Sequence, residues 1–203
     1  MKNQTEKIIE ILNKDYNFKK IKRDPFKVLI STILSQRTKD ENTERATKKL
    51  FSVTNKPSEI LKLSLKKIEK LIKTAGFYRN KAKVIKNVSK KLIKDYGGKV
   101  PDSLEELLKL KGVGRKTAGC VLVYAFNKPA IPVDVHVHRI SNRIGLVNTR
   151  NPENTEFELM KIFPKKNWIL LNNLFVKHGQ NICKPINPLC GFCKIRKYCK
   201  FIH

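Results

Sequence analysis

Apolar residues recur along almost the whole chain at the three-to-four-residue spacing of amphipathic helices, and no segment alternates as a half-buried strand would. The pattern therefore predicts an all-α fold. Capping signals mark several helix ends, among them Asp24 before Pro25, Ser103 with Glu106, and Gly97. The predicted helices cover 4–15, 25–34, a segment ending at 51, a short segment from 57, 64–75, 80–96, 104–110, 115–126, 135–144, 153–162 and 166–180.

The helix predicted over 25–34 is apolar on nearly every side, with Phe26, Leu29 and Ile33 among its residues. A helix at the protein surface keeps one polar face, so this helix is expected at the buried centre of a domain. A polar turn, 35–40, follows it. The last twenty residues or so, from Cys183, carry no helical period and are expected to be loop-like.

The charge of the chain is strongly positive, because 44 Lys and Arg stand against 17 Asp and Glu in 203 residues, a formal net charge of +27. Such a charge opposes compaction by self-repulsion and favours a polyanionic partner. A general lysine bias is the alternative source of part of the excess. The N-terminal segment is polar and amphipathic, and no segment approaches a membrane-spanning length. We therefore expect an intracellular protein that binds no membrane.

A tight turn, Gly112-Val113-Gly114, separates two of the predicted helices. Glycine permits positive φ and leaves the surface of a turn free of side chains. Backbone N–H groups at the start of the next helix, together with Arg115, can then contact an anion. A plain helical hairpin with a glycine cap is the alternative. The net charge favours a hairpin that holds a DNA phosphate without reading bases.

Lys116 lies on the first turn of the helix that follows, where the helix dipole disfavours a cation. A solvated lysine or a second phosphate contact is the ordinary interpretation. The unfavourable position of a cation on a first helical turn also indicates a function, since the positive helix end and Arg115 favour the neutral, nucleophilic amine. Such an amine can attack the anomeric carbon of a deoxyribose and form a Schiff base.

Asp134 follows Pro132 and Val133 and comes directly before a predicted helix. In that position an aspartate is expected to cap the helix through its carboxylate. The same carboxylate, held at a sugar, would stabilise positive charge developing on the ring. It would also help to deprotonate the lysine or a water molecule.

Four of the five cysteines, Cys183, Cys190, Cys193 and Cys199, form a C-x₆-C-x₂-C-x₅-C pattern near the end of the chain. Crowded cysteines in an intracellular chain indicate a metal site rather than disulfides. The spacing alone suits either Zn²⁺ or a [4Fe–4S] cluster. The fifth, Cys120, falls in an apolar helix and is expected to be an ordinary core residue.

Three motifs together resemble the endonuclease III family, within the helix-hairpin-helix superfamily of DNA glycosylases. They are Leu-x-Gly-Val-Gly-Arg-Lys-Thr-Ala at 110–118, Val-Asp-x-His at 133–136 and the cysteine pattern, in the order and spacing of the family. The resemblance implies that Lys116 is the nucleophile and Asp134 the catalytic carboxylate. It also implies that the four cysteines hold a [4Fe–4S] cluster.

The fold that this resemblance implies has two helical domains with a DNA-binding cleft between them. One is a six-helix barrel, expected at 23–131, with the helix-hairpin-helix at about 104–126. The other is an iron–sulfur domain, expected from 1–22 plus 132–203.

Two positions depart from the family pattern. Arg37, in a loop with Gln36, stands where the family usually has Gln. The resemblance implies that the residue at position 37 fills the space left by the extruded base. Lys111 replaces the usual proline before Gly112. Phe77 stands where a leucine-like wedge enters the duplex, because extruding a base leaves a gap that a side chain must fill. A core aromatic is the equally weighted alternative for Phe77.

The resemblance implies a bifunctional DNA N-glycosylase and AP lyase of base excision repair that removes oxidised pyrimidines. Its Schiff base on Lys116 would permit β-elimination 3′ to the abasic site. The expected partner is double-stranded DNA with a damaged base or abasic site, bound by a monomer in the cytoplasm or nucleoid. The alternatives are a monofunctional mismatch or adenine glycosylase and a non-catalytic DNA-binding hairpin module.

Overall fold

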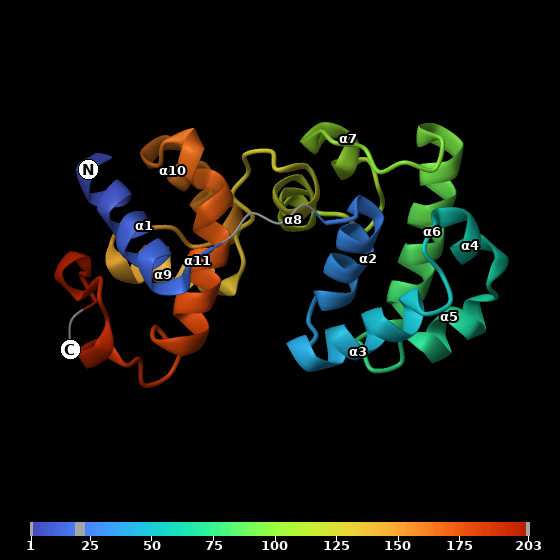
Figure 1. Cartoon of the computed structure of the whole chain (residues 1–203), viewed down its shortest axis with the longest axis horizontal. Coiled ribbons are helices and arrows are strands. Elements are labelled where there is room, and N and C mark those ends of the chain that lie inside the picture. Colours follow the sequence, from blue (N-terminus) through green and yellow to red (C-terminus); the bar gives the residue numbers. More distant parts are fainter. Residues whose placement is uncertain (1, 19–22, 202–203) are drawn as a thin grey trace. The chain divides into compact units, whose positions relative to one another are not determined.

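The computed structural model describes residues 2–18 and 23–201, and all regular secondary structure in these ranges is helical (Figure 1). The chain forms two compact units, one of Ile21–Phe126 and the other of Met1–Lys20 with Asn127–His203. The second boundary thus falls at the end of the helix after the glycine turn, whereas the resemblance placed it at 131. The first expected boundary, between 22 and 23, adjoins residues outside the described ranges.

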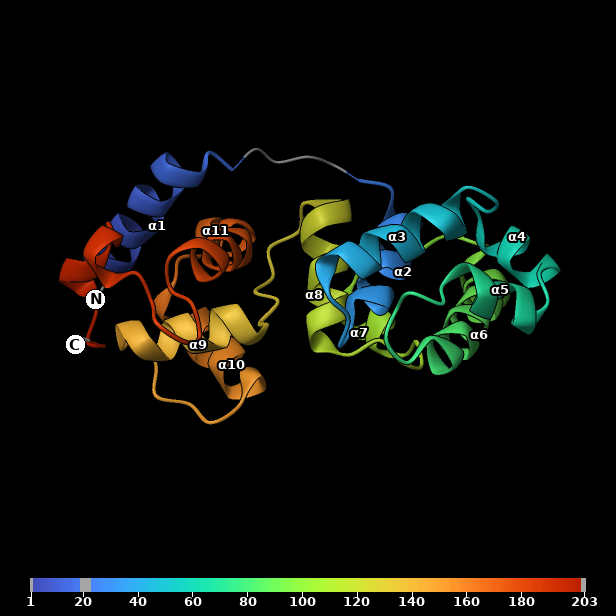
Figure 2. The same ribbon diagram turned by 90° about the horizontal axis from the view of Figure 1, so that it is seen from below.

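The unit Ile21–Phe126 is built around one apolar helix, α2, which packs against α3, α6 and α8 (Figures 1 and 2). Asp24 caps α2 by accepting a hydrogen bond from the Lys27 N–H at 2.8 Å, directly before Pro25. Seven residues of this short helix are buried, as its apolar pattern predicted. The helices of this unit are α2 (Pro25–Ser35), α3 (Asp40–Phe51), α4 (Pro57–Lys62), α5 (Leu65–Leu71), α6 (Tyr78–Tyr96), α7 (Leu104–Leu108) and α8 (Arg115–Phe126).

The helix expected over 64–75 ends four residues early, at Leu71. Tertiary partners take the polar groups of the segment that follows. Thr74 donates its hydroxyl to the Asn42 carbonyl at 3.1 Å, and Gly76 donates its N–H to the Thr38 hydroxyl at 3.1 Å. Gly76 therefore belongs to a contact between two loops.

The other unit packs α11 against α1 and α9 around a core that includes Ile8, Leu12, Ile140 and Phe175. The tail expected to be loop-like contains two single turns of 3₁₀-helix. No helix in residues 2–18 and 23–201 has the length and apolar character needed to cross a bilayer. The elements of this unit are α1 (Lys2–Tyr16), α9 (Val135–Ile144), α10 (Pro152–Ile162), η1 (Lys165–Asn167), α11 (Trp168–Asn181), η2 (Cys190–Phe192) and η3 (Arg196–Tyr198).

Candidate active site and metal centre

The glycine turn joins α7 to α8 and needs a glycine at its first position for two reasons. Gly112 has φ +90°, and a Cβ there would lie 2.6 Å from Cγ1 of Val84 on α6. Gly114 meets no atom within 4 Å of an added Cβ, so its outer face is open to a ligand. Val113 is buried, and its N–H donates to the Leu110 carbonyl at 2.9 Å. An anion would therefore be held by the first-turn N–H groups of α8, which lack acceptors within the helix.

Lys116 is half-buried on the first turn of α8. Its Nζ forms no hydrogen bond or ion pair with any residue of the described ranges. The amine is thus not committed to a structural contact, as a nucleophile requires. The next seven residues of α8, from Thr117 to Val123, are all buried, and Cys120 lies among them as the expected core cysteine.

Gln36 ties the loop after α2 to the glycine turn. Its side-chain amide donates to the Gly112 carbonyl at 3.3 Å and to the Thr117 hydroxyl at 3.2 Å. The sequence placed Gln36 among the residues that contact DNA. Its observed contacts join two candidate DNA-binding segments within one unit, so the loop and the hairpin turn form one surface.

Arg37 and Phe77 lie side by side, although forty residues separate them in the chain. The Arg37 guanidinium is 5.9 Å from the centroid of the Phe77 ring. Phe77 is 64% exposed, so the alternative that it is a core aromatic is wrong. Both residues have left-handed backbones, with φ 49° at Arg37 and 56° at Phe77, a conformation that is costly for residues other than glycine.

Asp134 caps α9 with a single carboxylate oxygen. Its Oδ1 accepts from the N–H groups of His136 and Val137, each at 2.9 Å. Its Oδ2 has no hydrogen-bond partner in the part of the chain that the structure describes. The cap therefore fixes the carboxylate while leaving one oxygen for chemistry. Asp134 and Lys116 belong to different units, so their pairing stays a prediction.

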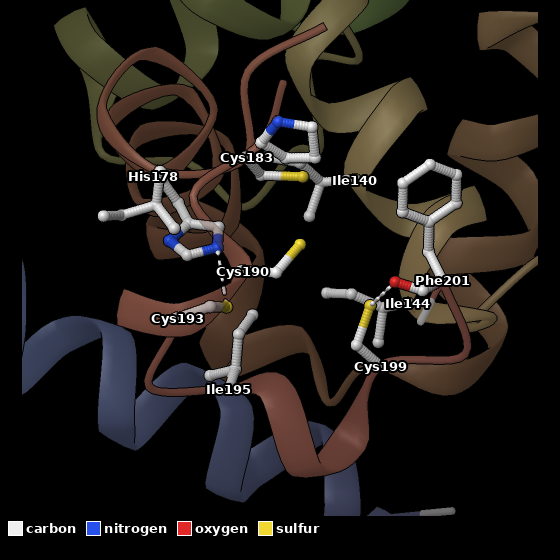
Figure 3. A pocket seen from close by; sticks show the side chains of 11 residues that line it. Ile140, Ile144, His178, Cys183, Cys190, Cys193, Ile195, Cys199 and Phe201 are labelled. Carbon is white, nitrogen blue, oxygen red and sulfur yellow. Dashed lines mark hydrogen bonds between the residues drawn. The ribbon is translucent and has the colours of Figure 1, made fainter. Parts of the chain in front are cut away.

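The four cysteines of the tail direct their sulfur atoms into one pocket (Figure 3). Its apolar wall includes Ile140, Ile144 and Ile195. Within residues 2–18 and 23–201, no group of three or more His, Cys, Asp or Glu side chains is arranged to hold a single metal ion. Four thiols that face one apolar pocket are a donor set that suits the four-cysteine iron–sulfur cluster implied by the family.

Polar side chains surround this pocket behind the sulfur atoms. Arg143 approaches Cys183 Sγ at 3.6 Å, and its guanidinium lies 4.4 Å from the centroid of the Phe201 ring. His178 Nε2 lies 3.6 Å from Cys193 Sγ, while its Nδ1 is 3.2 Å from the Tyr16 hydroxyl. Burial lowers the pKa of His178 to about 4, so the ring is neutral near pH 7.

Burial also raises the pKa of the Cys193 and Cys199 thiols. These two thiols would therefore need nearby positive charge to become thiolate ligands. Arg143 supplies one such charge at Cys199, whose pKa it lowers against the effect of burial. A bound metal group would supply the rest.

Sequence reasoning missed one buried charge beside the candidate DNA-binding loops. Lys81, on α6, is only 3% exposed and donates to three oxygen atoms. A signal was present, because Lys81 lies four residues before Ile85 on the apolar stripe of its helix. A lysine on that stripe must either interrupt the core or find buried acceptors.

Comparison with known proteins identifies the class. Residues 30–165 match the model of the HhH-GPD superfamily base excision DNA repair proteins. The fold agrees: the structure of a trapped endonuclease III–DNA covalent intermediate superposes with a TM-score of 0.91 at 35% identity, covering 99% of this chain and 96% of that one. A thermostable thymine-DNA glycosylase superposes with a TM-score of 0.86 at 28% identity, covering 98% and 96%.

Curated relatives narrow the class to a family. Endonuclease III of Thermotoga maritima is 57% identical over 178 residues, 88% of this chain and 84% of the relative. Endonuclease III of Bacillus subtilis is 39% identical over 87% and 81%. The chain belongs to the endonuclease III family and is a DNA glycosylase and AP lyase of base excision repair. A mismatch-specific monofunctional enzyme and a non-catalytic hairpin module are not favoured.

Proposed function

We propose that the chain removes oxidised pyrimidines from duplex DNA, with Lys116 as nucleophile and Asp134 as its carboxylate partner. The observation that carries the proposal is the position of Lys116, uncommitted on the first turn of α8 and two residues beyond the open face of Gly114. A hairpin that grips the backbone there would bring the sugar of a neighbouring nucleotide to the amine.

The chemistry that follows uses the amine twice. Lys116 Nζ attacks C1′ of the extruded nucleotide, and the N-glycosidic bond breaks so that the base leaves with the bonding electrons and takes up a proton. Opening of the sugar ring then gives a Schiff base between Lys116 and C1′. Loss of a C2′ proton from this Schiff base expels the 3′ phosphate by β-elimination. Asp134, through the free oxygen Oδ2, stabilises the positive charge that develops on the sugar during base loss.

Gly112-Val113-Gly114 and Arg115 would hold the backbone on one side of this sugar, and the loop with Gln36 is tied to that turn. Arg37 and Phe77 would occupy the space that the extruded nucleotide vacates, since an unstacked gap costs a few kcal/mol unless a side chain fills it. Phosphate contacts of this kind position the enzyme without sequence preference.

The four tail cysteines are proposed to hold a [4Fe–4S] cluster. The donor set fits, because four thiols from one short segment face a single apolar pocket with arginine behind it. The cluster would cross-link residues 183–199 and so fix the tail against α9 and α11. Arg143 of α9 also holds the tail, because it donates to the Lys184 and Pro185 carbonyls at 2.6 and 2.8 Å.

Borohydride trapping tests the proposal. The wild-type protein should form a covalent adduct with duplexes carrying thymine glycol or oxidised cytosine, and it should cut the strand 3′ to the lesion. Duplexes with 8-oxoguanine or an undamaged mismatch should give little adduct. Lys116→Ala should abolish the adduct, while Lys128→Ala, an exposed lysine just beyond α8, should retain it. Base release without any adduct in the wild type would contradict the proposed nucleophile.

A further inference from the structure

Lys81 is a buried ammonium with no carboxylate partner in the described ranges. Its Nζ donates to the Leu34 carbonyl at 2.7 Å, the Gln36 carbonyl at 2.5 Å and the Thr38 hydroxyl at 2.7 Å. An ammonium has three N–H donors, so each donor has one acceptor. Burying a charge is unfavourable unless it is fully hydrogen-bonded, and these three bonds meet that requirement without a counter-ion.

The acceptors belong to the end of α2 and the loop after it. Leu34 and Gln36 contribute carbonyls that α2 cannot use internally, since the last carbonyls of a helix lack partners within it. A positive charge is favourable at this end of a helix. Lys81 thus stabilises the C-terminus of α2 from a different helix, α6, and fixes where the chain leaves α2.

The Thr38 hydroxyl extends this hydrogen-bond network to a second loop, which contains Gly76 and Phe77. Its hydroxyl accepts from Lys81, accepts from the Gly76 N–H at 3.1 Å and donates to the Gln36 carbonyl at 3.1 Å. The two loops are also in close contact, because a Cβ on Gly76 would lie 2.6 Å from the Arg37 carbonyl oxygen. One ammonium and one hydroxyl therefore join the loop of Arg37 to the loop of Phe77.

The residues at the tips of these loops need such support. Arg37 and Phe77 both have left-handed backbones, which persist in non-glycine residues only where the surroundings determine them. Three groups adjoin Arg37: the Gln36 carbonyl, the Thr38 hydroxyl and Gly76. Each of them contacts Lys81 or its partner Thr38. Lys81 itself lies one helical turn after Phe77 and donates its own N–H to the Phe77 carbonyl at 3.0 Å.

We propose that Lys81 is a positioning residue that holds Arg37 and Phe77 as one rigid pair, so that both enter the duplex together when a nucleotide is extruded. This inference rests on the proposed function, in which Arg37 and Phe77 fill the vacated space. Lys81 touches neither the substrate nor the reacting atoms. Burial lowers its pKa to about 8, so the ammonium with three donors is the prevailing form at neutral pH.

The choice of lysine follows from the geometry of the acceptors. A planar guanidinium presents its donors as a fork, whereas an ammonium directs three donors to three separate oxygens. A methionine of similar length would leave these acceptors without their donor, which costs more than losing the bond alone. Lys81→Met therefore removes the attachment while preserving much of the side-chain volume in the core.

The experiment compares two abasic substrates, one in a duplex and one in a single strand, by borohydride trapping under single-turnover conditions. Only the duplex requires a pair of side chains to replace an extruded nucleotide. Lys81→Met should slow trapping on the duplex at least tenfold and on the single strand less than twofold. Lys90→Met, an exposed lysine on the same helix, should leave both rates unchanged.

A second variant keeps the test decisive if Lys81→Met does not fold. Thr38→Val removes the hydroxyl that joins the loops and should lower the duplex rate selectively, whereas Thr38→Ser should restore it. Fluorescence of 2-aminopurine placed opposite the abasic site reports unstacking of the duplex, and it should fall in Lys81→Met and Thr38→Val alike.

Three outcomes separate the possibilities. Equal slowing on duplex and single strand by both Lys81→Met and Thr38→Val would show a general structural role and overturn the inference. A duplex rate unchanged in both variants would also overturn it. Absence of trapping by the wild type on either substrate would instead refute the proposed function.

Discussion

Asp134 has an observed role as the N-cap of α9 and a proposed role in base release, and one pair of substitutions can separate the two. As the N-cap of α9 it accepts two backbone N–H groups through Oδ1, and Asp134→Ala removes that acceptor. Loss of such a cap costs about 1 kcal/mol, which lowers the melting temperature of a chain of this size by about 2–4 °C. Loss of a catalytic carboxylate costs a factor of about 10²–10⁴ in rate.

Asp134→Asn keeps an oxygen that can accept both N–H groups, and asparagine is as good a cap as aspartate. It should therefore melt close to the wild type and well above Asp134→Ala. It cannot carry the negative charge, so base release from a thymine glycol duplex should fall in both variants by the same large factor. Thermal melting followed by circular dichroism and single-turnover base release measure the two effects independently.

Two results would refute this reasoning in different ways. A wild-type rate of base release in Asp134→Asn would show that the carboxylate has no catalytic role and is only a cap. A melting temperature of Asp134→Asn as low as that of Asp134→Ala would show that the destabilisation does not come from the lost cap. Because the two measurements are separate, a loss of activity caused by unfolding cannot be mistaken for a loss of chemistry.

Two further predictions concern the glycine turn and the tail. Gly112→Ala adds a methyl group 2.6 Å from Val84 at φ +90°, so it should lower the unfolding free energy by at least about 1–2 kcal/mol. Gly114→Ala places its methyl group near no other atom, so it should melt near the wild type yet bind duplex DNA more weakly. Equal melting temperatures of the two variants would contradict the steric requirement for glycine at position 112. The purified protein should be brown, with about four iron atoms per chain, and Cys190→Ser should lose both the colour and the stability of the tail; a colourless protein with one zinc ion would refute the cluster.

Most helices were predictable because they bury one apolar stripe, whereas the all-round apolar pattern of Phe26 to Leu34 correctly placed α2 at the centre. Local capping was equally readable: Ser103 accepts from the Glu106 N–H at 3.3 Å, as the first half of a capping box requires. The Glu106 carboxylate, in contrast, accepts from Tyr96 at 2.8 Å and from Lys109. Side-chain partners beyond the helix are set by tertiary structure, which local patterns do not report.

The candidate site shows the same difference between features set by local sequence and features set by tertiary structure. The glycine turn before α8 and the gathering of four cysteines around one pocket were predictable, because both follow from spacing along the chain. The left-handed backbones of Arg37 and Phe77 were not predictable, since neither residue type favours such a conformation. The burial of Lys81 was not predicted, because only its place on an apolar stripe distinguished it from the many solvated lysines of the chain.

The attachment made by Lys81 does not depend on which side chain stands at position 37. Two of its three acceptors are main-chain oxygens, of Leu34 and Gln36, which every amino acid supplies. Substitution of the side chain at position 37 therefore leaves the anchor of the loop intact. The left-handed backbone still filters the choice, disfavouring β-branched residues and admitting glycine, asparagine or an unbranched side chain. Different side chains at position 37, which is proposed to fill the space of the extruded base, would therefore be compatible with the same loop anchor.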